Sequence, residues 1–187
     1  MSANTIYVLI ALVFILLVVI SIYNQLILLK NRVKNAYAQI EVQLKRRHDL
    51  IPNLVETVKG YMQHEKAIFD NIAKARSLAM NISDNAAVQA KSENTLSGTL
   101  KSLFAVAENY PDLKANQNFL QLHEELVSTE NKIGFARQFY NDAVMQYNTK
   151  KETFPNNIIC SMFKFDDYSM FEIENSQERE VVKVDLG

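Results

Sequence analysis

The sequence is poor in the residues that interrupt helices and in those that crosslink a chain. Its 187 residues include four Gly, three Pro, one Cys and no Trp. The single cysteine, Cys160, excludes an intramolecular disulfide and a Cys-rich zinc site, and we interpret it as a semi-buried, inert thiol. Because turn formers are so few, while Leu, Ala, Lys, Gln and Glu recur through long stretches, the composition favours helices.

The chain also lacks an excess of charge of either sign. Its 20 Lys and Arg residues stand against 21 Asp and Glu residues, which gives a formal net charge of −1. No global electrostatic field would therefore draw the whole protein to nucleic acid or to anionic lipid. Any such binding would have to be local.

Charge is absent altogether from the first 29 residues, and IYVLIALVFILLVVISIY, residues 6–23, contains Ser21 as its one polar side chain. About 18 apolar residues are enough to cross the hydrocarbon of a bilayer as a helix. A cleaved signal peptide would show a basic n-region, a shorter apolar region and a small-residue cleavage site, and this segment shows none of them. We expect residues 1–29 to be an uncleaved anchor that contacts membrane lipid through residues 6–29.

Three basic residues follow the apolar segment and predict its orientation. Lys30, Arg32 and Lys34 come directly after it, whereas the N-terminal side carries only the terminal amine. By the positive-inside rule, the bulk of the protein is then cytoplasmic and the N-terminus lies outside. The sequence thus predicts a single-pass protein of the cell (inner) membrane.

Beyond the anchor, apolar residues recur at steps of three and four, which is the pattern of a helix with one buried face. We predict one long helical region that reaches about Met80. Pro52 is its strong interruption, because the proline ring clashes with the carbonyl of His48 in a straight helix. We expect a kink between Asp49 and Pro52, with Asp49 accepting hydrogen bonds from backbone donors freed there.

The rest of the chain divides at polar and proline-containing segments. NISDNAAVQAKSEN, residues 81–94, reads as a surface connection because its periodicity is weak. A helix that follows it should end before Pro111, and a long helix should run from about Asn116 to Thr153, where FPNN ends it. The predicted buried stripe of this helix is Phe119, Leu122, Leu126, Ile133, Tyr140, Val144 and Tyr147. We expect three parts in all: the anchor at residues 1–29, a helical bundle at residues 30–160, and a docked aromatic segment with a mobile acidic tail at residues 161–187.

A second basic cluster, Lys45, Arg46 and Arg47, lies in LKRRHDLIPNLVETVKGYMQHE. A straight helix would place Lys45 about 24 Å from Leu29, which is beyond the roughly 8 Å over which salt screens charge. The cluster is therefore a solvated face, a set of ion pairs with acidic residues of other helices, or a partner-binding patch. No aromatics interleave with it, so we expect no nucleic acid partner. The candidate contacts to lipid or to a protein partner are Lys30, Arg32, Lys34, Lys45, Arg46 and Arg47.

No motif for catalysis or metal binding stands out in the sequence. Zinc proteases need two His at i and i+4 around a Glu, and di-iron bundles need Glu-x-x-His. None of His48, His64 and His123 stands in either pattern, and we interpret each as a polar surface or boundary residue. No nucleophile elbow, P-loop or Gly-rich phosphate cradle is present. We therefore expect a protein that is not an enzyme and holds no cofactor or metal.

Three long stretches resemble the LemA family of bacterial membrane-anchored proteins: VKNAYAQIEVQLKRRHDLIPNLVETVKGYMQHE, ENYPDLKANQNFLQLHEELVSTENKI and ARQFYNDAVMQYNTKKETFPNNII. The resemblance implies a transmembrane helix followed by an elongated bundle of antiparallel helices, with no established enzymatic activity. Related sequences are associated with magnetosome membranes and with a heat-shock membrane metalloprotease. The family commonly has a Trp near the position of Tyr37, and this chain departs from that pattern.

The pattern and the resemblance together predict an all-α fold: an N-terminal transmembrane helix, an elongated antiparallel LemA-like bundle and a short non-helical acidic C-terminal tail. The apolar residues expected to line the bundle core include Leu50, Ile51, Leu54, Val55 and Val58. Tyr110, Pro111 and Asp112 should form the turn before the last long helix. Glu130 and Asn131 either make polar contacts inside the bundle or point to water.

Three hypotheses about function follow from these features. The first is a non-enzymatic, single-pass scaffold or adaptor for protein–protein interaction, with a protein partner or a homo-oligomer. The second is a self-assembling protein that organises the membrane, with the basic residues 30–34 gripping lipid. The third, least favoured, is an enzyme assembled from scattered Glu, Asp and His side chains.

Overall fold

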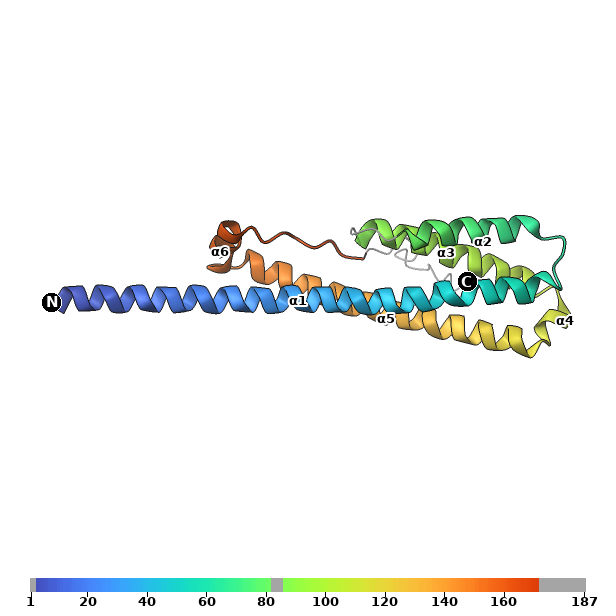
Figure 1. The fold of residues 1–187 in the computed structure, drawn as a ribbon, viewed down its shortest axis with the longest axis horizontal. Coiled ribbons are helices and arrows are strands. Elements are labelled where there is room, and N and C mark those ends of the chain that lie inside the picture. The colour runs from blue at the N-terminus through green and yellow to red at the C-terminus, as the bar shows by residue number, and fades with distance from the viewer. Residues whose placement is uncertain (1–2, 82–85, 172–187) are drawn as a thin grey trace, which may run out of the picture. The chain divides into compact units, whose positions relative to one another are not determined.

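The structure is a computed structural model that describes residues 3–81 and 86–171. The part of the chain so described is helical and contains no strand, which confirms the predicted all-α class, with a long apolar N-terminal helix and a helical bundle. The part of the predicted acidic tail that follows residue 171 lies outside the described residues. The helices are α1 (Ala3–Lys59), α2 (Lys66–Met80), α3 (Ala86–Ala107), α4 (Pro111–Lys114), α5 (Gln117–Glu152) and α6 (Asn156–Phe163) (Figure 1).

The chain forms two compact units, and α1 and α5 contribute to both. Among the described residues, unit 1 contains residues 3–42 and 134–168, and unit 2 contains residues 43–81, 86–133 and 169–171. The division into an anchor, a bundle and a C-terminal part that the sequence suggests, at residues 29 and 160, stays a prediction about domain organisation.

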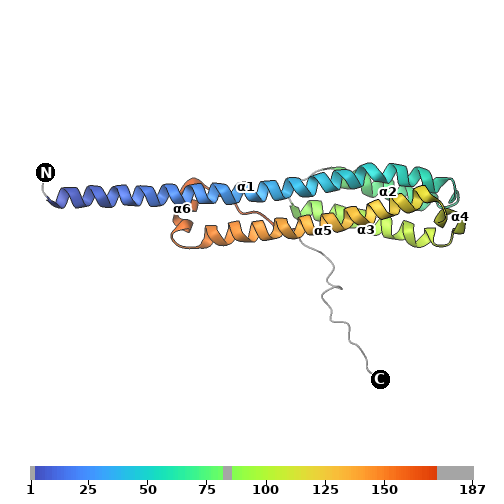
Figure 2. The ribbon, with the colours of Figure 1, turned by 90° about the horizontal axis from the view of Figure 1, so that it is seen from below.

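Unit 1 holds the N-terminal part of α1, the C-terminal part of α5, and α6. By length and composition, α1 can cross a membrane, and its apolar window is not buried within the protein. Beyond that window the two long helices run side by side in opposite directions (Figures 1 and 2), and the rings of Tyr37 and Tyr140 meet edge to face at 5.6 Å. The buried residues of this pair are Leu26, Leu29, Val33, Ala36, Ile40, Tyr140, Ala143, Val144 and Tyr147.

The residues that directly follow α6 contact α5 within unit 1. Phe165 is buried, and its carbonyl accepts a hydrogen bond from Lys151 Nζ at 2.9 Å. The Tyr147 hydroxyl donates to the carbonyl of Asp166 at 3.0 Å, and Asn148 Nδ2 donates to the carbonyl of Tyr168 at 3.0 Å. Side chains of α5 thus satisfy the backbone of a segment that forms no helix of its own.

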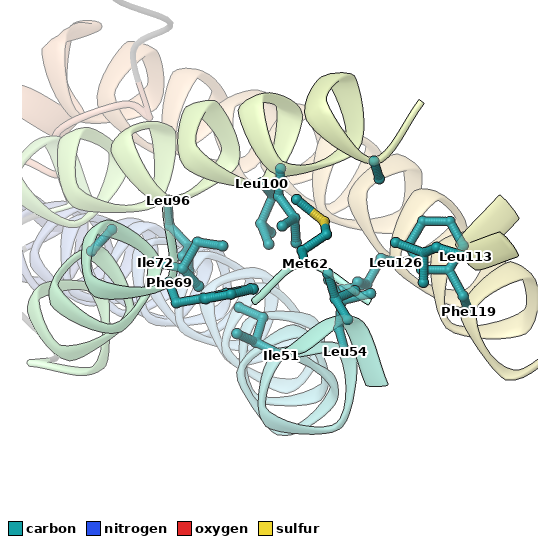
Figure 3. Close-up of a cluster of buried hydrophobic side chains, with 14 of the residues drawn as sticks. Ile51, Leu54, Met62, Phe69, Ile72, Leu96, Leu100, Leu113, Phe119 and Leu126 are labelled. Carbon is teal, nitrogen blue, oxygen red and sulfur yellow. The ribbon is translucent and has the colours of Figure 1, made fainter. Parts of the chain in front are cut away.

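Unit 2 packs the end of α1, α2, α3 and the start of α5 around one apolar core (Figure 3). Ile51, Leu54 and Val58 of α1 are almost fully buried in it, as predicted, and Leu50 and Val55 pack at its edge. The predicted stripe of α5 is confirmed by Phe119 and Leu126 here and by Ile133, Tyr140, Val144 and Tyr147 further along. Pro111 occupies the first turn of α4, where its missing N–H is not needed.

One expectation about helix ends is wrong. The first helical region does not reach Met80, because α1 ends at Lys59 and a turn at residues 60–65 precedes α2. Gly60 weakens the helix there, and burial of Met62 in the core turns the chain back. FPNN does end α5, yet a further helix, α6, follows it.

The helix passes through Pro52 without interruption, and a neighbouring helix compensates for the missing donor. Because Pro52 has no N–H, the carbonyl of His48 has no partner within α1. Arg76 of α2 donates to this carbonyl from Nε at 3.0 Å. The Asp49 side chain, which was expected to accept hydrogen bonds from backbone donors, pairs with Lys45 one turn away at 3.0 Å.

Residues 86–94, predicted as part of a surface connection, are the first turns of α3. Gln89 and Glu93 are buried there, although they are polar. Because these buried positions carry polar residues, the apolar period of the sequence is weak there. Glu93 belongs to a buried charge network in unit 2.

Candidate functional site, a buried charge network in unit 2

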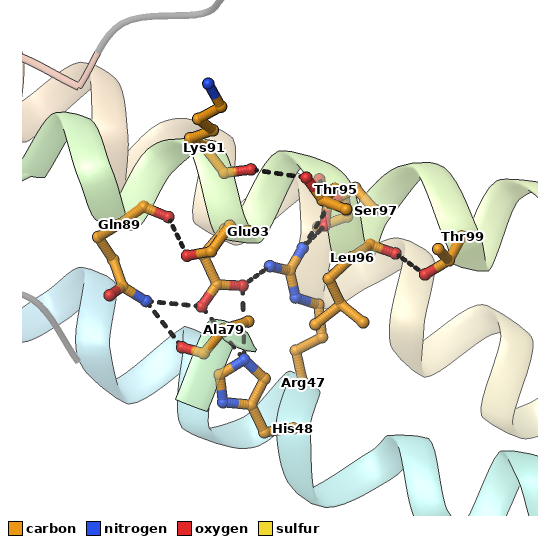
Figure 4. A network of polar contacts seen from close by, with 12 residues as sticks. Arg47, His48, Ala79, Gln89, Lys91, Glu93, Thr95, Leu96, Ser97 and Thr99 are labelled. Carbon is orange, nitrogen blue, oxygen red and sulfur yellow. Dashed lines mark hydrogen bonds and ion pairs between the residues drawn. The ribbon is translucent and has the colours of Figure 1, made fainter. Parts of the chain in front are cut away.

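A network of charged and polar side chains joins three helices inside unit 2. Arg47 on α1 is 1% exposed and Glu93 on α3 is 0% exposed, and Arg47 Nη2 donates to Glu93 Oε2 (Figure 4). Arg47 Nη1 donates to Glu130 Oε2 on α5 at 2.6 Å and to Ser97 Oγ on α3 at 2.8 Å. One guanidinium therefore connects α1, α3 and α5 through charge-assisted hydrogen bonds.

Gln89 and His48 also contact the Glu93 carboxylate, so both of its oxygens have polar partners. Gln89 Nε2 donates to Oε1 at 3.0 Å, and it also donates to the carbonyl of Ala79 at the end of α2 at 3.0 Å. His48 Nε2 lies 3.2 Å from Oε1 and 3.4 Å from Oε2. Ser97 Oγ in turn donates to Glu130 Oε1 at 3.1 Å.

The pKa of Glu93 is lower than its ordinary value of 4.5. Burial alone would raise this pKa, because it disfavours the charged form. The hydrogen bond to His48, the charges of Arg47 and His48 and the hydrogen bond to Arg47 together outweigh burial. Glu93 is thus held as a carboxylate in a dry site.

Other polar groups on the same helices bond back to their own backbone. Thr95 Oγ1 donates to the carbonyl of Lys91 at 3.0 Å, and Thr99 Oγ1 donates to that of Leu96 at 2.8 Å (Figure 4). These bonds satisfy hydroxyls on α3 without linking helices. The network between helices therefore rests on Arg47, Glu93, Glu130, His48 and Gln89.

A cavity of about 400 Å³ adjoins the network in unit 2. Arg47, Ser97 and Glu130 line it beside apolar residues such as Leu100 and Leu126. Apolar walls with a few polar groups are the usual composition of small-molecule sites. The ring of His123, which also lines the cavity, lies edge to face against Phe104 at 4.4 Å.

The three histidines have different surroundings. His48 is buried and pairs with Glu93, so its prediction as a surface or boundary residue is wrong. His123 is half-buried and His64 is exposed, in agreement with the prediction. Within residues 3–81 and 86–171, no three His, Cys, Asp or Glu side chains gather into a group that could hold a metal ion.

The six basic residues singled out in the sequence fall into different environments. In unit 2, Lys45 is exposed, Arg46 lies 3.8 Å from Glu125, and Arg47 is buried among carboxylates. Pairing with acidic residues of other helices, one of the alternatives for this cluster, describes Arg46 and Arg47, and a side chain as buried as Arg47 does not face an outside partner. In unit 1, Lys30 is half-buried near the ring of Phe165, while Arg32 and Lys34 are exposed. Their contact with lipid stays a prediction.

Glu130 makes the polar contact inside the bundle that was one of its two alternatives, whereas Asn131 is exposed. The sequence pattern did not indicate a role for Glu93, Gln89 and Ser97. The spacing of Gln89 and Glu93 could have indicated their burial. They lie at steps of three and four from the apolar stripe of the same helix, which contains Leu96, Leu100, Leu103 and Ala107. Polar residues on an apolar stripe mark a buried network.

Within residues 3–81 and 86–171, these observations define a helical protein with one candidate membrane span and a helical bundle that contains a buried charge network. A sequence model of the LemA family matches residues 36–186. The chain therefore belongs to the LemA family.

Named relatives agree with this assignment. The chain is 31% identical to Protein LemA of Metamycoplasma hominis over 167 residues, which cover 88% of this chain and 74% of the relative. It is 20% identical to the magnetosome proteins MamQ 2 and MamQ 1 of Paramagnetospirillum magneticum over 189 residues, which cover 88% of this chain and 70% of each relative.

Proposed function

We propose that this chain is a non-enzymatic, single-pass scaffold or adaptor that binds another protein at the bacterial cell membrane. In this proposal α1 crosses the inner membrane with the N-terminus outside, and the bundle is cytoplasmic. Lys30, Arg32 and Lys34, which follow the apolar run, lie beside anionic headgroups.

The observation that carries the proposal is a pair of exposed aromatic side chains on α5 in unit 1. Phe135 is 72% exposed and Phe139 is 53% exposed, and a spacing of four residues places both on one face of the helix. Neighbouring exposed aromatics outside a membrane span are typical of protein interaction surfaces, in which such side chains contribute much of the affinity.

The buried network supports the same assignment in a second way. Glu93 and Glu130 each form an ion pair with Arg47 within the bundle. Their role is to hold α1, α3 and α5 together, so the contact proposed for a partner is the aromatic face of α5 and not the basic cluster at residues 45–47.

The test is capture of the full-length tagged protein from native membranes after crosslinking, followed by mass spectrometry. The wild type is compared with Phe135→Ser/Phe139→Ser. The matched control is Leu78→Ser/Met80→Ser, because these side chains on α2 are also apolar and exposed. We expect one stoichiometric protein that the Phe variant loses and the control retains.

Two results would overturn the adaptor proposal. One is a set of bound proteins that is the same for the Phe variant and the wild type. The other is recovery of only multiples of this chain, lost in the Phe variant, which would instead support self-assembly on the membrane.

A further inference from the structure

We propose that α6 is a membrane-surface helix that inserts its exposed apolar side chains among the lipid headgroups, beside the point at which α1 leaves the bilayer. This inference rests on the proposed membrane crossing of α1. It adds a second contact with the same bilayer, made by residues about 130 positions further along the chain.

α6 lies beside the part of α1 at which the apolar stretch ends. Tyr23 is the last residue of the apolar stretch at residues 6–23, where a helix that spans the hydrocarbon would reach the headgroups. Its ring contacts Phe163 of α6 at 5.1 Å and Phe165 at 5.8 Å. Both views show α6 beside this part of α1 (Figures 1 and 2). Any bilayer that surrounds residues 6–23 therefore has its surface at α6.

α6 has one buried face and one exposed apolar face. Ile159 and Cys160 are buried against unit 1. Ile158 and Met162, one turn apart on another face, are 51% and 72% exposed, and Phe154 just before the helix is 78% exposed. A short helix with one face on the protein and apolar residues on the other has the pattern of a helix that lies in the membrane interface.

Positively charged side chains lie beside the exposed apolar face of α6. Lys164, directly after α6, is exposed and has a left-handed backbone conformation with φ of 52°, so the chain turns there and Phe165 reaches Tyr23. Lys30 Nζ lies 5.9 Å from the centre of the Phe165 ring, and Lys151 pairs with Asp167. Asp166 and Asp167 are both exposed acidic groups of this region. Lys30 and Lys164 thus flank the apolar face with positive charge, which favours anionic lipid.

The experiment measures contact with lipid at one position at a time in the full chain reconstituted into vesicles. The vesicles contain brominated phosphatidylcholine and a minor fraction of phosphatidylglycerol. In a Cys160→Ala background, a single cysteine carrying a fluorophore replaces Ser161 on the exposed face of α6. The same label at Phe14 reports on the span, and at Phe139 on a part of α5 level with Tyr37, about 20 Å beyond Tyr23 along the helix.

We expect bromine quenching at positions 14 and 161 and none at 139. Adding Phe154→Ser, Ile158→Ser and Met162→Ser should remove most of the quenching at 161. The matched triple change Phe135→Ser, Phe139→Ser and Met145→Ser, also at exposed apolar side chains, should leave it unchanged. Helix content by circular dichroism checks each variant, and Cys160→Val replaces Cys160→Ala if the latter lowers it.

The possible failures separate the two proposals. Quenching at 14 with none at 161 overturns the membrane contact of α6 while the anchor stands. Quenching at 161 that survives the triple change on α6 also overturns it, because the apolar face would then not be the contact. No quenching at 14 shows that α1 is not in the bilayer, and both proposals fall.

Discussion

The ionisation of Glu93 depends on the folded state. This residue has no exposed surface, yet its pKa lies below 4.5 because its cationic and hydrogen-bonding partners outweigh the effect of burial. A carboxyl group with a lower pKa in the folded than in the unfolded state stabilises the fold when it is ionised. That contribution is fully present above the unfolded pKa and disappears as pH falls through the folded pKa.

The first prediction is therefore an acid-sensitive bundle. The free energy of unfolding of the full chain in mild detergent, measured by urea titration with circular dichroism, should fall as pH decreases from about 5 to about 3. Glu93→Gln should lower stability near neutral pH by about 3 kcal/mol, since it breaks a buried ion pair, and it should flatten the acid limb. The charged and titratable groups around Glu93 and its partners are Arg47, His48, Arg76 and Glu130.

The control for this prediction is Glu125→Gln. Glu125 lies 3.8 Å from Arg46 in a solvent-exposed pair, so its loss should change stability by less than about 1 kcal/mol. An acid limb that is equally steep in Glu93→Gln and in the wild type would show that Glu93 does not carry the pH dependence.

The sequence indicates that charged residues of the network could form ion pairs, but it does not indicate which residues pair. Arg46 and Arg47 could be assigned to internal ion pairs as one alternative, because acidic residues are abundant on the other helices. His48 and Glu93 could not be paired from sequence, since they stand 45 positions apart and their contact depends on how α1 meets α3. Contacts between helices are fixed by tertiary packing, which a local pattern does not contain.

At the scale of elements, regular apolar spacing predicted the helices well wherever the buried stripe is apolar. The stripe of α5 is of this kind. The first turns of α3 were missed because Gln89 and Glu93 occupy stripe positions as polar residues. The end of α1 was misplaced because apolar spacing continues from α1 into α2, while the turn at residues 60–65 depends on the burial of Met62 in the core. Pro52 lies within α1, and Arg76 of α2 donates to the His48 carbonyl there.

The second prediction tests this compensation with a double-mutant cycle. Arg76→Ala removes the donor to the His48 carbonyl and should cost about 1 kcal/mol of unfolding free energy, because the group is left without its partner. In a Pro52→Ala background, the new N–H of residue 52 can bond to the same carbonyl. Arg76→Ala should then cost less, and the coupling energy should be at least about 0.5 kcal/mol by urea unfolding.

Lys74→Ala is the matched control for the loss of a cation from α2, because Lys74 is exposed on the same helix. Its cost should be small and should not depend on residue 52. Equal costs of Arg76→Ala in the two backgrounds would mean that the helix tolerates Pro52 for another reason.

At the scale of the whole molecule, the orientation of the chain in the membrane can be tested by cysteine labelling. The native thiol of Cys160 is a poor reporter of this orientation. Cys160 is buried, and burial raises the pKa of its thiol, so the reactive thiolate is scarce and shielded. Failure of a maleimide to label Cys160 in intact cells would fit either orientation. The charge of Lys30, Arg32 and Lys34 argues for a cytoplasmic bundle, and a test needs exposed cysteines on both sides of the apolar run.

The third prediction uses Cys160→Ala with one new cysteine at a time. Asn4→Cys lies before the apolar run and Lys114→Cys lies in α4 of unit 2, and both positions are exposed. Because cations are retained on the cytoplasmic side, a membrane-impermeant maleimide should label position 4 in intact cells and position 114 only after the membrane is permeabilised. The reverse pattern would place the bundle outside. Labelling of both positions in intact cells would show that the chain does not cross the membrane between them.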